Sequence, residues 1–355
     1  MDDEPFGFSL KSPFIQFYLC HFLGDADLSS NKFPELTFTQ CTINKLEVDG
    51  GSAIKVELRS NHVRYFSLDE DTIQREVSLL SGTFKDSVLL TGTYFKDDVT
   101  LSSDTIGRYL SFNGSRFNGF LYIHNLTLPE ELSFENVDLT NLKGEVDLTN
   151  YKPGKSLCWI NLYGADISKF RIRFSGFRLK FPEGLSFEEK AYVYQQLINK
   201  MEKDGLYESH QALSIEFKQL KYQNDHSVFL NWLDKNWWGY GFNKFLIVRN
   251  AILICFIFFV INCFLFNKLL TDVYNIKAIA ALDTRLKKRF ENKPRYRSII
   301  MIPVIFIYTS YIFWGLKLDV EKLTLKSIPL FVLVMFQYLS GIVCLAYLAN
   351  FILSK

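Results

Sequence analysis

The strongest constraint on the fold is an apolar residue that recurs every 11 positions from residue 73 onward. Three such columns run through successive units, and every position in them is apolar. The columns are Ile73, Phe84, Phe95, Ile106, Phe117 and Leu128; Val77, Val88, Val99, Leu110, Leu121 and Leu132; and Leu79, Leu90, Leu101, Phe112, Ile123 and Phe134. Turn-forming residues such as Gly82, Asp98 and Asn113 stand between the units.

An 11-residue unit is too short for a pair of helices. The second and third columns lie two residues apart and flank one outward residue, which is the alternation of a strand. The repeat therefore predicts a β-solenoid, in which each rung stacks on the last and buries its apolar columns against its neighbours. A meander of short antiparallel hairpins is the alternative.

Looser rungs extend the pattern in both directions. Residues 36–43 and 54–58 alternate upstream, and residues 139–148 and 163–170 continue the pattern downstream with a slip in register. We expect the solenoid to cover residues 34–177, after an N-terminal cap over residues 1–33.

The stretch from Ser81 to Phe95 resembles the divergent, Phe-rich pentapeptide-repeat proteins in spacing and residue type. The strict Ala-Asp/Asn-Leu unit of that family is not kept. The resemblance implies a right-handed β-helix as the fold of this domain.

A helical connector is predicted over residues 186–241. Ser186 with Glu189 matches a capping box, helical periodicity follows, and Gly205 marks a stop before a second helix. A third helical piece ends in aromatic residues just before the first apolar run, where an interfacial belt would lie; they are Trp237, Trp238 and Tyr240.

Apolar runs over residues 245–266, 299–316 and 328–353 predict an α-helical transmembrane bundle within residues 245–355. The first and third are apolar on all sides and long enough to cross a lipid bilayer. The second has only 18 residues, so it either spans or re-enters. Polar residues at membrane depth are candidates for function or for helix contacts, namely Asn262, Thr309, Ser310, Gln337, Ser340 and Asn350.

Two rules disagree about the loop over residues 268–297, which is strongly basic. The positive-inside rule assigns this loop to the cytosol. The acidic start of the chain does not resemble a signal peptide, so we expect a cytoplasmic N-terminal domain, and one crossing then puts the loop outside. The loop alternatively forms a basic helix on lipid headgroups, through Arg285, Lys287, Lys288, Arg289, Arg295 and Arg297. In either case we expect a multi-pass protein of the inner (plasma) membrane.

The order of segments over residues 186–355 resembles the bacterial two-helix potassium-channel modules that are often fused to pentapeptide repeats. The resemblance implies a pore with the candidates Thr309, Ser310, Trp314, Gly315, Lys317, Asp319, Gln337, Ser340 and Gly341. Only Gly315 and Asp319 match the potassium filter, and Lys317 would repel cations. We therefore expect a pore that is not potassium-selective.

No catalytic, metal or cofactor motif stands out, and the net charge of +2 gives no reason to expect a nucleic-acid partner. We expect a homo-oligomeric, non-enzymatic membrane effector or ion-channel-like protein. Its cytosolic solenoid would sense or dock an unknown protein and control a small pore, a role suited to bacterial stress or phage defence. The alternative is a non-conducting, membrane-anchored adaptor with the solenoid as its binding platform.

Overall fold

The computed structural model describes residues 14–29, 32–289, 294–315, 323 and 326–353. The chain divides into two compact units, residues 1–224 and residues 225–355.

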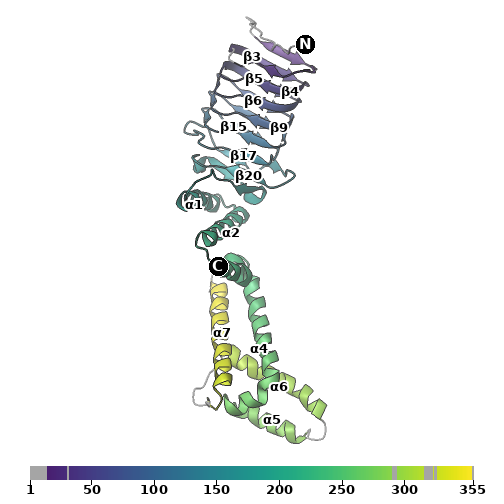
Figure 1. The fold of residues 1–355 in the computed structure, drawn as a ribbon, viewed down its shortest axis with the longest axis vertical. Coiled ribbons are helices and arrows are strands. Elements are labelled where there is room, and N and C mark those ends of the chain that lie inside the picture. Colours follow the sequence, from purple (N-terminus) through teal and green to yellow (C-terminus); the bar gives the residue numbers. More distant parts are fainter. Residues whose placement is uncertain (1–13, 30–31, 290–293, 316–322, 324–325, 354–355) are drawn as a thin grey trace. The chain divides into compact units, whose positions relative to one another are not determined.

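The first unit contains a β-solenoid of about seven turns over residues 15–179, built from two long parallel sheets and one short strand pair (Figure 1). One sheet holds β1 (Ile15–Tyr18), β3 (Lys32–Thr39), β5 (Ser52–Arg59), β7 (Thr72–Ile73), β8 (Val77–Leu80), β10 (Tyr94–Phe95), β11 (Val99–Ser102), β14 (Arg116–Phe117) and β15 (Leu121–His124). The other holds β2 (Ala26–Asp27), β4 (Thr42–Glu47), β6 (His62–Ser67), β9 (Thr83–Leu89), β12 (Thr105–Ile106), β13 (Tyr109–Ser111), β16 (Leu126–Thr127), β17 (Glu131–Ser133), β19 (Tyr151–Lys152), β20 (Cys158–Asn161) and β22 (Phe177–Leu179). The short pair is β18 (Val146–Leu148) and β21 (Phe170–Ile172), accompanied by the 3-10 turns η1 (Ile167–Lys169) and η2 (Phe174–Gly176).

The strand register explains the 11-residue period. Val99 pairs with Val77 and with Leu121, so one turn takes 22 residues in this region. Each 11-residue repeat is therefore half a turn, and consecutive repeats lie in opposite sheets. The predicted solenoid is confirmed, with parallel strands instead of hairpins. Each repeat pairs with the repeat 22 residues away, because the chain crosses to the opposite sheet after every 11-residue repeat.

The core of the solenoid includes the three predicted columns, and every one of their residues is buried. Aromatic rings of successive turns stack inside it, with ring centroids 4.9 Å apart for Phe95 and Phe117 and 5.0 Å apart for Phe112 and Phe134. The solenoid starts at Ile15, before the expected residue 34, because β1 pairs with β3 in the same parallel register.

Buried polar side chains lie at the corners of the turns and bond to the backbone one turn away. Asn61 accepts a hydrogen bond from the Cys41 N–H (2.7 Å) and donates one to the Phe38 carbonyl (2.9 Å). Asp104 stands at the equivalent corner and accepts from the Gly82 N–H (2.7 Å), but its second carboxylate oxygen has no hydrogen-bond partner. Burial raises the pKa of Asp104 to about 7.

Helices α1 (Phe187–Lys203) and α2 (Tyr207–Asn224) close the C-terminal end of the solenoid. The capping box of Ser186 and Glu189 is present at the start of α1. On the inner side, Leu197 and Leu213 belong to the same buried core as the strands. The Ser209 hydroxyl accepts a hydrogen bond from the Phe174 N–H (2.9 Å). The expected connector over residues 186–241 is thus divided, because α1 and α2 belong to the first unit.

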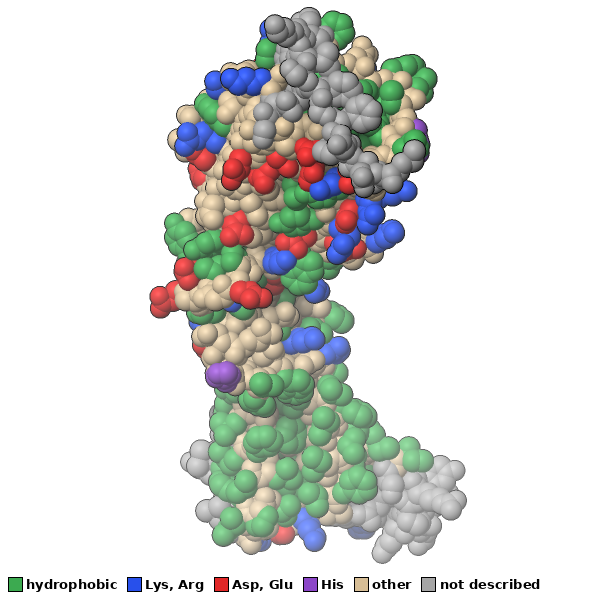
Figure 2. Space-filling view, turned by 45° about the horizontal axis from the view of Figure 1, so that its top comes forward, with side chains coloured by type: hydrophobic (Ala, Val, Ile, Leu, Met, Phe, Trp, Pro, Cys, Tyr) green, Lys and Arg blue, Asp and Glu red, His purple; other side chains and the backbone are tan. Residues whose placement is uncertain are grey.

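The second unit is helical. It contains α3 (Val228–Trp238), the turn η3 (Gly239–Gly241), α4 (Lys244–Asp272), α5 (Lys277–Arg289), α6 (Pro294–Phe313) and α7 (Ile328–Leu353). Phe245–Asp272 and Ile328–Ala349 are long and apolar enough to cross a membrane, whereas Ile299–Phe313 is a shorter apolar helix. Figure 2 shows that hydrophobic side chains dominate the visible surface of this unit, while charged ones gather on the solenoid.

Candidate functional site

Helices α4 and α7 run antiparallel. At one end of the bundle the rings of Trp237, just before α4, and Tyr347, late in α7, have centroids 5.8 Å apart. At the other end the Lys326 N–H, just before α7, donates to the Asp272 carbonyl, the last of α4 (3.3 Å). The chain therefore enters and leaves the bundle at the same end.

Helix α6 starts at the far end of this bundle and stops halfway along it (Figure 1). Its last residue, Phe313, packs on Phe258 near the middle of α4, with ring centroids 6.1 Å apart. The chain then returns, because Leu323 forms an antiparallel bridge with Tyr274, just beyond α4. The apolar part of α6 would extend about 21 Å at 1.5 Å per residue, short of a hydrocarbon core of roughly 30 Å. The chain therefore enters α6 and returns at Leu323 at the same end of the bundle.

Three polar side chains from three helices meet inside the bundle, and each is fully buried. Asn262 of α4 donates through Nδ2 to Thr309 Oγ1 on α6 (2.9 Å) and to Gln337 Oε1 on α7 (3.1 Å). Gln337 in turn donates through Nε2 to the Thr309 carbonyl (2.9 Å). The polar cluster Asn262–Thr309–Gln337 therefore holds α6 between the two long helices.

Gly341 on α7 lies directly under the end of α6. A Cβ built on Gly341 would stand 1.4 Å from the Phe313 carbonyl oxygen, so only glycine fits here. Gly341 was one of the expected pore candidates, and the structure gives it a helix-packing contact. Ser340, beside it, lines a shallow groove with Trp237 and Phe336.

The remaining pore candidates lie at and beyond the end of α6. Gly315 ends the helix with a positive φ of 62°, and a Cβ there would contact the Tyr338 ring at 3.5 Å. Trp314 packs edge-on against Phe313. The side chain of Ser310 is partly buried. Lys317 and Asp319 lie outside the described residues.

The basic helix α5 packs through Ile279 and Leu286 onto the buried cluster that contains Val304, Ile305 and Tyr308 of α6. Its basic side chains Arg285, Lys288 and Arg289 are exposed. Helix α5 is therefore amphipathic, with its apolar face on protein and its basic face exposed. The side chains of Lys287, Arg295 and Arg297 are outside the described part.

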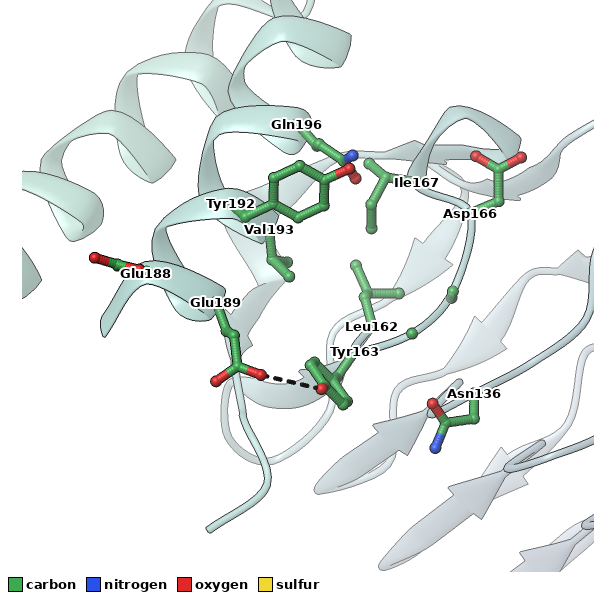
Figure 3. A pocket seen from close by; sticks show the side chains of 12 residues that line it. Asn136, Leu162, Tyr163, Asp166, Ile167, Glu188, Glu189, Tyr192, Val193 and Gln196 are labelled. Carbon is green, nitrogen blue, oxygen red and sulfur yellow. Dashed lines mark hydrogen bonds between the residues drawn. The ribbon is translucent and has the colours of Figure 1, made fainter. Parts of the chain in front are cut away.

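A separate groove of about 740 Å³ lies in the first unit, between the last turn of the solenoid and α1 (Figure 3). Tyr163 and the exposed Tyr192 contribute aromatic surface, and the Tyr163 hydroxyl donates to Glu189 Oε1 (3.4 Å). Asp166 and Glu188 add acidic groups to the lining. This groove was not anticipated, because no sequence pattern joins residues 163 and 192. Among the described residues no group of His, Cys, Asp and Glu side chains is arranged to hold a metal ion.

No family model, curated protein or solved structure matches this chain.

Proposed function

We propose that this chain is one subunit of an oligomeric membrane pore that is controlled by its solenoid unit. The single observation that carries the proposal is that α6 stops halfway along the antiparallel helices α4 and α7 and that the chain then returns to the end where α6 began. We interpret this path as a re-entrant helix in the membrane. A helix that enters only half of the bilayer ends near the membrane centre and is followed there by non-helical backbone. Such irregular backbone is tolerated there when it is buried in protein or lines a water-filled cavity.

The proposal requires several copies of the chain. Within one subunit the side chains of Asn262, Thr309 and Gln337 are turned inward and bonded to one another. A lumen would therefore form between subunits, around the C-terminal end of α6. We keep the expectation that this pore is not potassium-selective, because Lys317 follows the end of α6 closely in the sequence.

One observation favours the second candidate, a non-conducting anchored adaptor. Every exposed side chain in the described part of α7 is apolar, as on a helix that faces lipid alone. The exposed residues are Ile328, Pro329, Val332, Phe336, Leu339, Ile342, Val343, Leu345, Ala346 and Ala349. In this candidate the solenoid binds a protein partner and the bundle only holds it at the membrane.

For localisation we propose the inner membrane, with the solenoid unit in the cytoplasm and the basic α5 at the opposite face. Free thiols support a reducing compartment for the solenoid, since Cys20, Cys41 and Cys158 are all unpaired. This arrangement runs against the positive-inside rule, which makes sidedness a direct test.

Two measurements on the purified full chain distinguish the candidates. A pore predicts a closed oligomer by native mass spectrometry and ion flux from protein-containing liposomes. A monomer without flux refutes the pore and leaves the adaptor.

For the proposed role in stress or phage defence, membrane depolarisation after expression in bacteria is the expected effect, and normal growth with full polarisation contradicts it.

A further inference from the structure

Helix α3 buries none of its residues. Four large apolar side chains stand on one stripe at helical spacing and face outward. Their exposed fractions are 78% for Val228, 69% for Phe229, 59% for Trp232 and 36% for Leu233. We refer to these four residues as the α3 stripe.

Two polar side chains of α3 are bonded within the helix and its following turn, whereas Lys235 and Asn236 are exposed. Asn231 Oδ1 accepts a hydrogen bond from the Tyr240 hydroxyl (2.6 Å), and Asp234 Oδ1 accepts one from Trp238 Nε1 (2.5 Å). A helix that faces water shows the opposite arrangement, with its apolar stripe packed inward and its polar side chains outward. The stripe therefore faces something other than water.

The rest of the bundle fixes α3 in place. Asn250 of α4 donates through Nδ2 to the carbonyls of Asn236 (2.7 Å) and Trp237 (3.2 Å), which caps the end of α3. Trp238 contacts the Tyr347 ring edge-on at 5.4 Å between centroids. The turn between α3 and α4 has positive φ at Gly239, Tyr240 and Gly241. Helix α3 is thus a rigid part of the bundle end where the first long apolar helix begins.

We propose that α3 is an interfacial helix whose stripe inserts into the boundary between headgroups and acyl chains of the bilayer. The proposal rests on the membrane location proposed for the second unit. Its occupant is the bilayer because α3, which carries the stripe, is capped at its end by Asn250 of α4, in the turns of α4 where Phe245 is 72% and Ile252 60% exposed. Trp and Phe at this depth match the preference of aromatic side chains for the membrane interface.

This assignment differs from the aromatic belt predicted from the sequence. Trp237 and Trp238 pack on Tyr347, and Tyr240 is buried. In the proposal, the residues at the membrane interface are instead those of the α3 stripe, one to three helical turns earlier in the chain.

The test uses the intrinsic fluorescence of the full chain in lipid vesicles. The difference between the wild type and Trp232→Phe isolates the emission of Trp232. Lipids brominated close to the headgroup should quench this emission at least twofold more than lipids brominated near the bilayer centre, and aqueous iodide should quench it little. Trp159 of the solenoid, 45% exposed, is the matched control: its Trp159→Phe difference should respond to iodide and not to brominated lipid.

Two outcomes overturn the proposal. Quenching of Trp232 by iodide to the extent seen for Trp159 means that the stripe faces water. No quenching by either reagent means that protein covers it, a second copy of this chain or another partner. The emission of Trp314, obtained as the difference between the wild type and Trp314→Phe, distinguishes failure of the α3 proposal from failure of the proposed function. If deep-brominated lipid quenches Trp314 while Trp232 is insensitive to lipid, the membrane location stands and only the α3 proposal fails; insensitivity of both overturns both.

Discussion

Replacing Asp104 by Asn should stabilise the solenoid at neutral pH. Asn61 at the equivalent corner uses both ends of its amide, whereas one oxygen of Asp104 is unpartnered. Leu79 occupies the position equivalent to Phe38. Leu79 pairs with Leu101, three residues before Asp104, and Phe38 pairs with Leu58, three residues before Asn61. An amide at position 104 can therefore accept from Gly82 and donate to the carbonyl of residue 79.

The magnitude follows from the raised pKa. Asp104 has a pKa of about 7 in the folded chain against an ordinary value of 3.8. Between these values the folded state holds one more proton than the unfolded state, so the free energy of unfolding falls as pH rises from about 4 to about 7 and is then constant. At 1.36 kcal/mol per unit, the ionised carboxylate destabilises the fold by up to about 4 kcal/mol at pH 8. Asn lacks this effect.

The assay is thermal unfolding of the full chain in detergent, followed by the circular dichroism of the β-sheet. At pH 8 Asp104→Asn should raise the midpoint by about 5–15 °C, and near pH 4 it should leave the midpoint almost unchanged. The reverse change, Asn61→Asp, should lower the midpoint at pH 8 and spare it near pH 4. An effect of Asp104→Asn that is equal at both pH values would refute the reasoning, because the destabilisation by Asp104 would then not come from ionisation of its carboxyl group.

Three further changes test the packing. Gly341→Ala should lower the unfolding temperature of the helical unit and loosen α6, whereas Gly24→Ala, where a Cβ meets no atom within 4 Å, should be neutral; equal effects would contradict the contact with α6. Asn262→Leu and Gln337→Leu should each destabilise the bundle in detergent, with a coupling of about 0.6 kcal/mol and at most roughly 1.7 in a double-mutant cycle, and additive effects would exclude their hydrogen bond. Ser186→Ala should cost about 1 kcal/mol by removing the cap of α1, measured by denaturant unfolding; Ser186→Asp is the conservative control that should retain most of the stability.

The solenoid could be predicted because its signal is repeated. Each apolar column reports the same environment many times, and the burial of Phe84, Val88 and Leu90 follows from their spacing alone. The assignment of alternate repeats to opposite sheets could not be derived, because an 11-residue step is compatible with a full short rung or with half of a longer one. Strand pairing decides this, as in the partnership of Val77 with Val99.

The arrangement of the bundle was harder to predict. Residues 299–313 form a shorter apolar helix, and the path of the chain after it depends on where Leu323 pairs, with Tyr274. Asn262, Thr309 and Gln337 were recognisable one by one as polar residues at membrane depth. Their meeting could not be predicted, since it joins residues 47 and 75 positions apart.

The most direct test of the account is the side of the membrane on which residues flanking α6 lie. Single cysteines at Ser227, Lys288 and Lys326 would be labelled in sealed vesicles with a membrane-impermeant maleimide, with the signal of the parent chain subtracted. The account predicts that Lys288→Cys and Lys326→Cys react from one side and Ser227→Cys from the other. Reaction of Lys326→Cys from the same side as Ser227→Cys would show that α6 crosses the bilayer, and the re-entrant helix on which the proposed pore rests would be wrong.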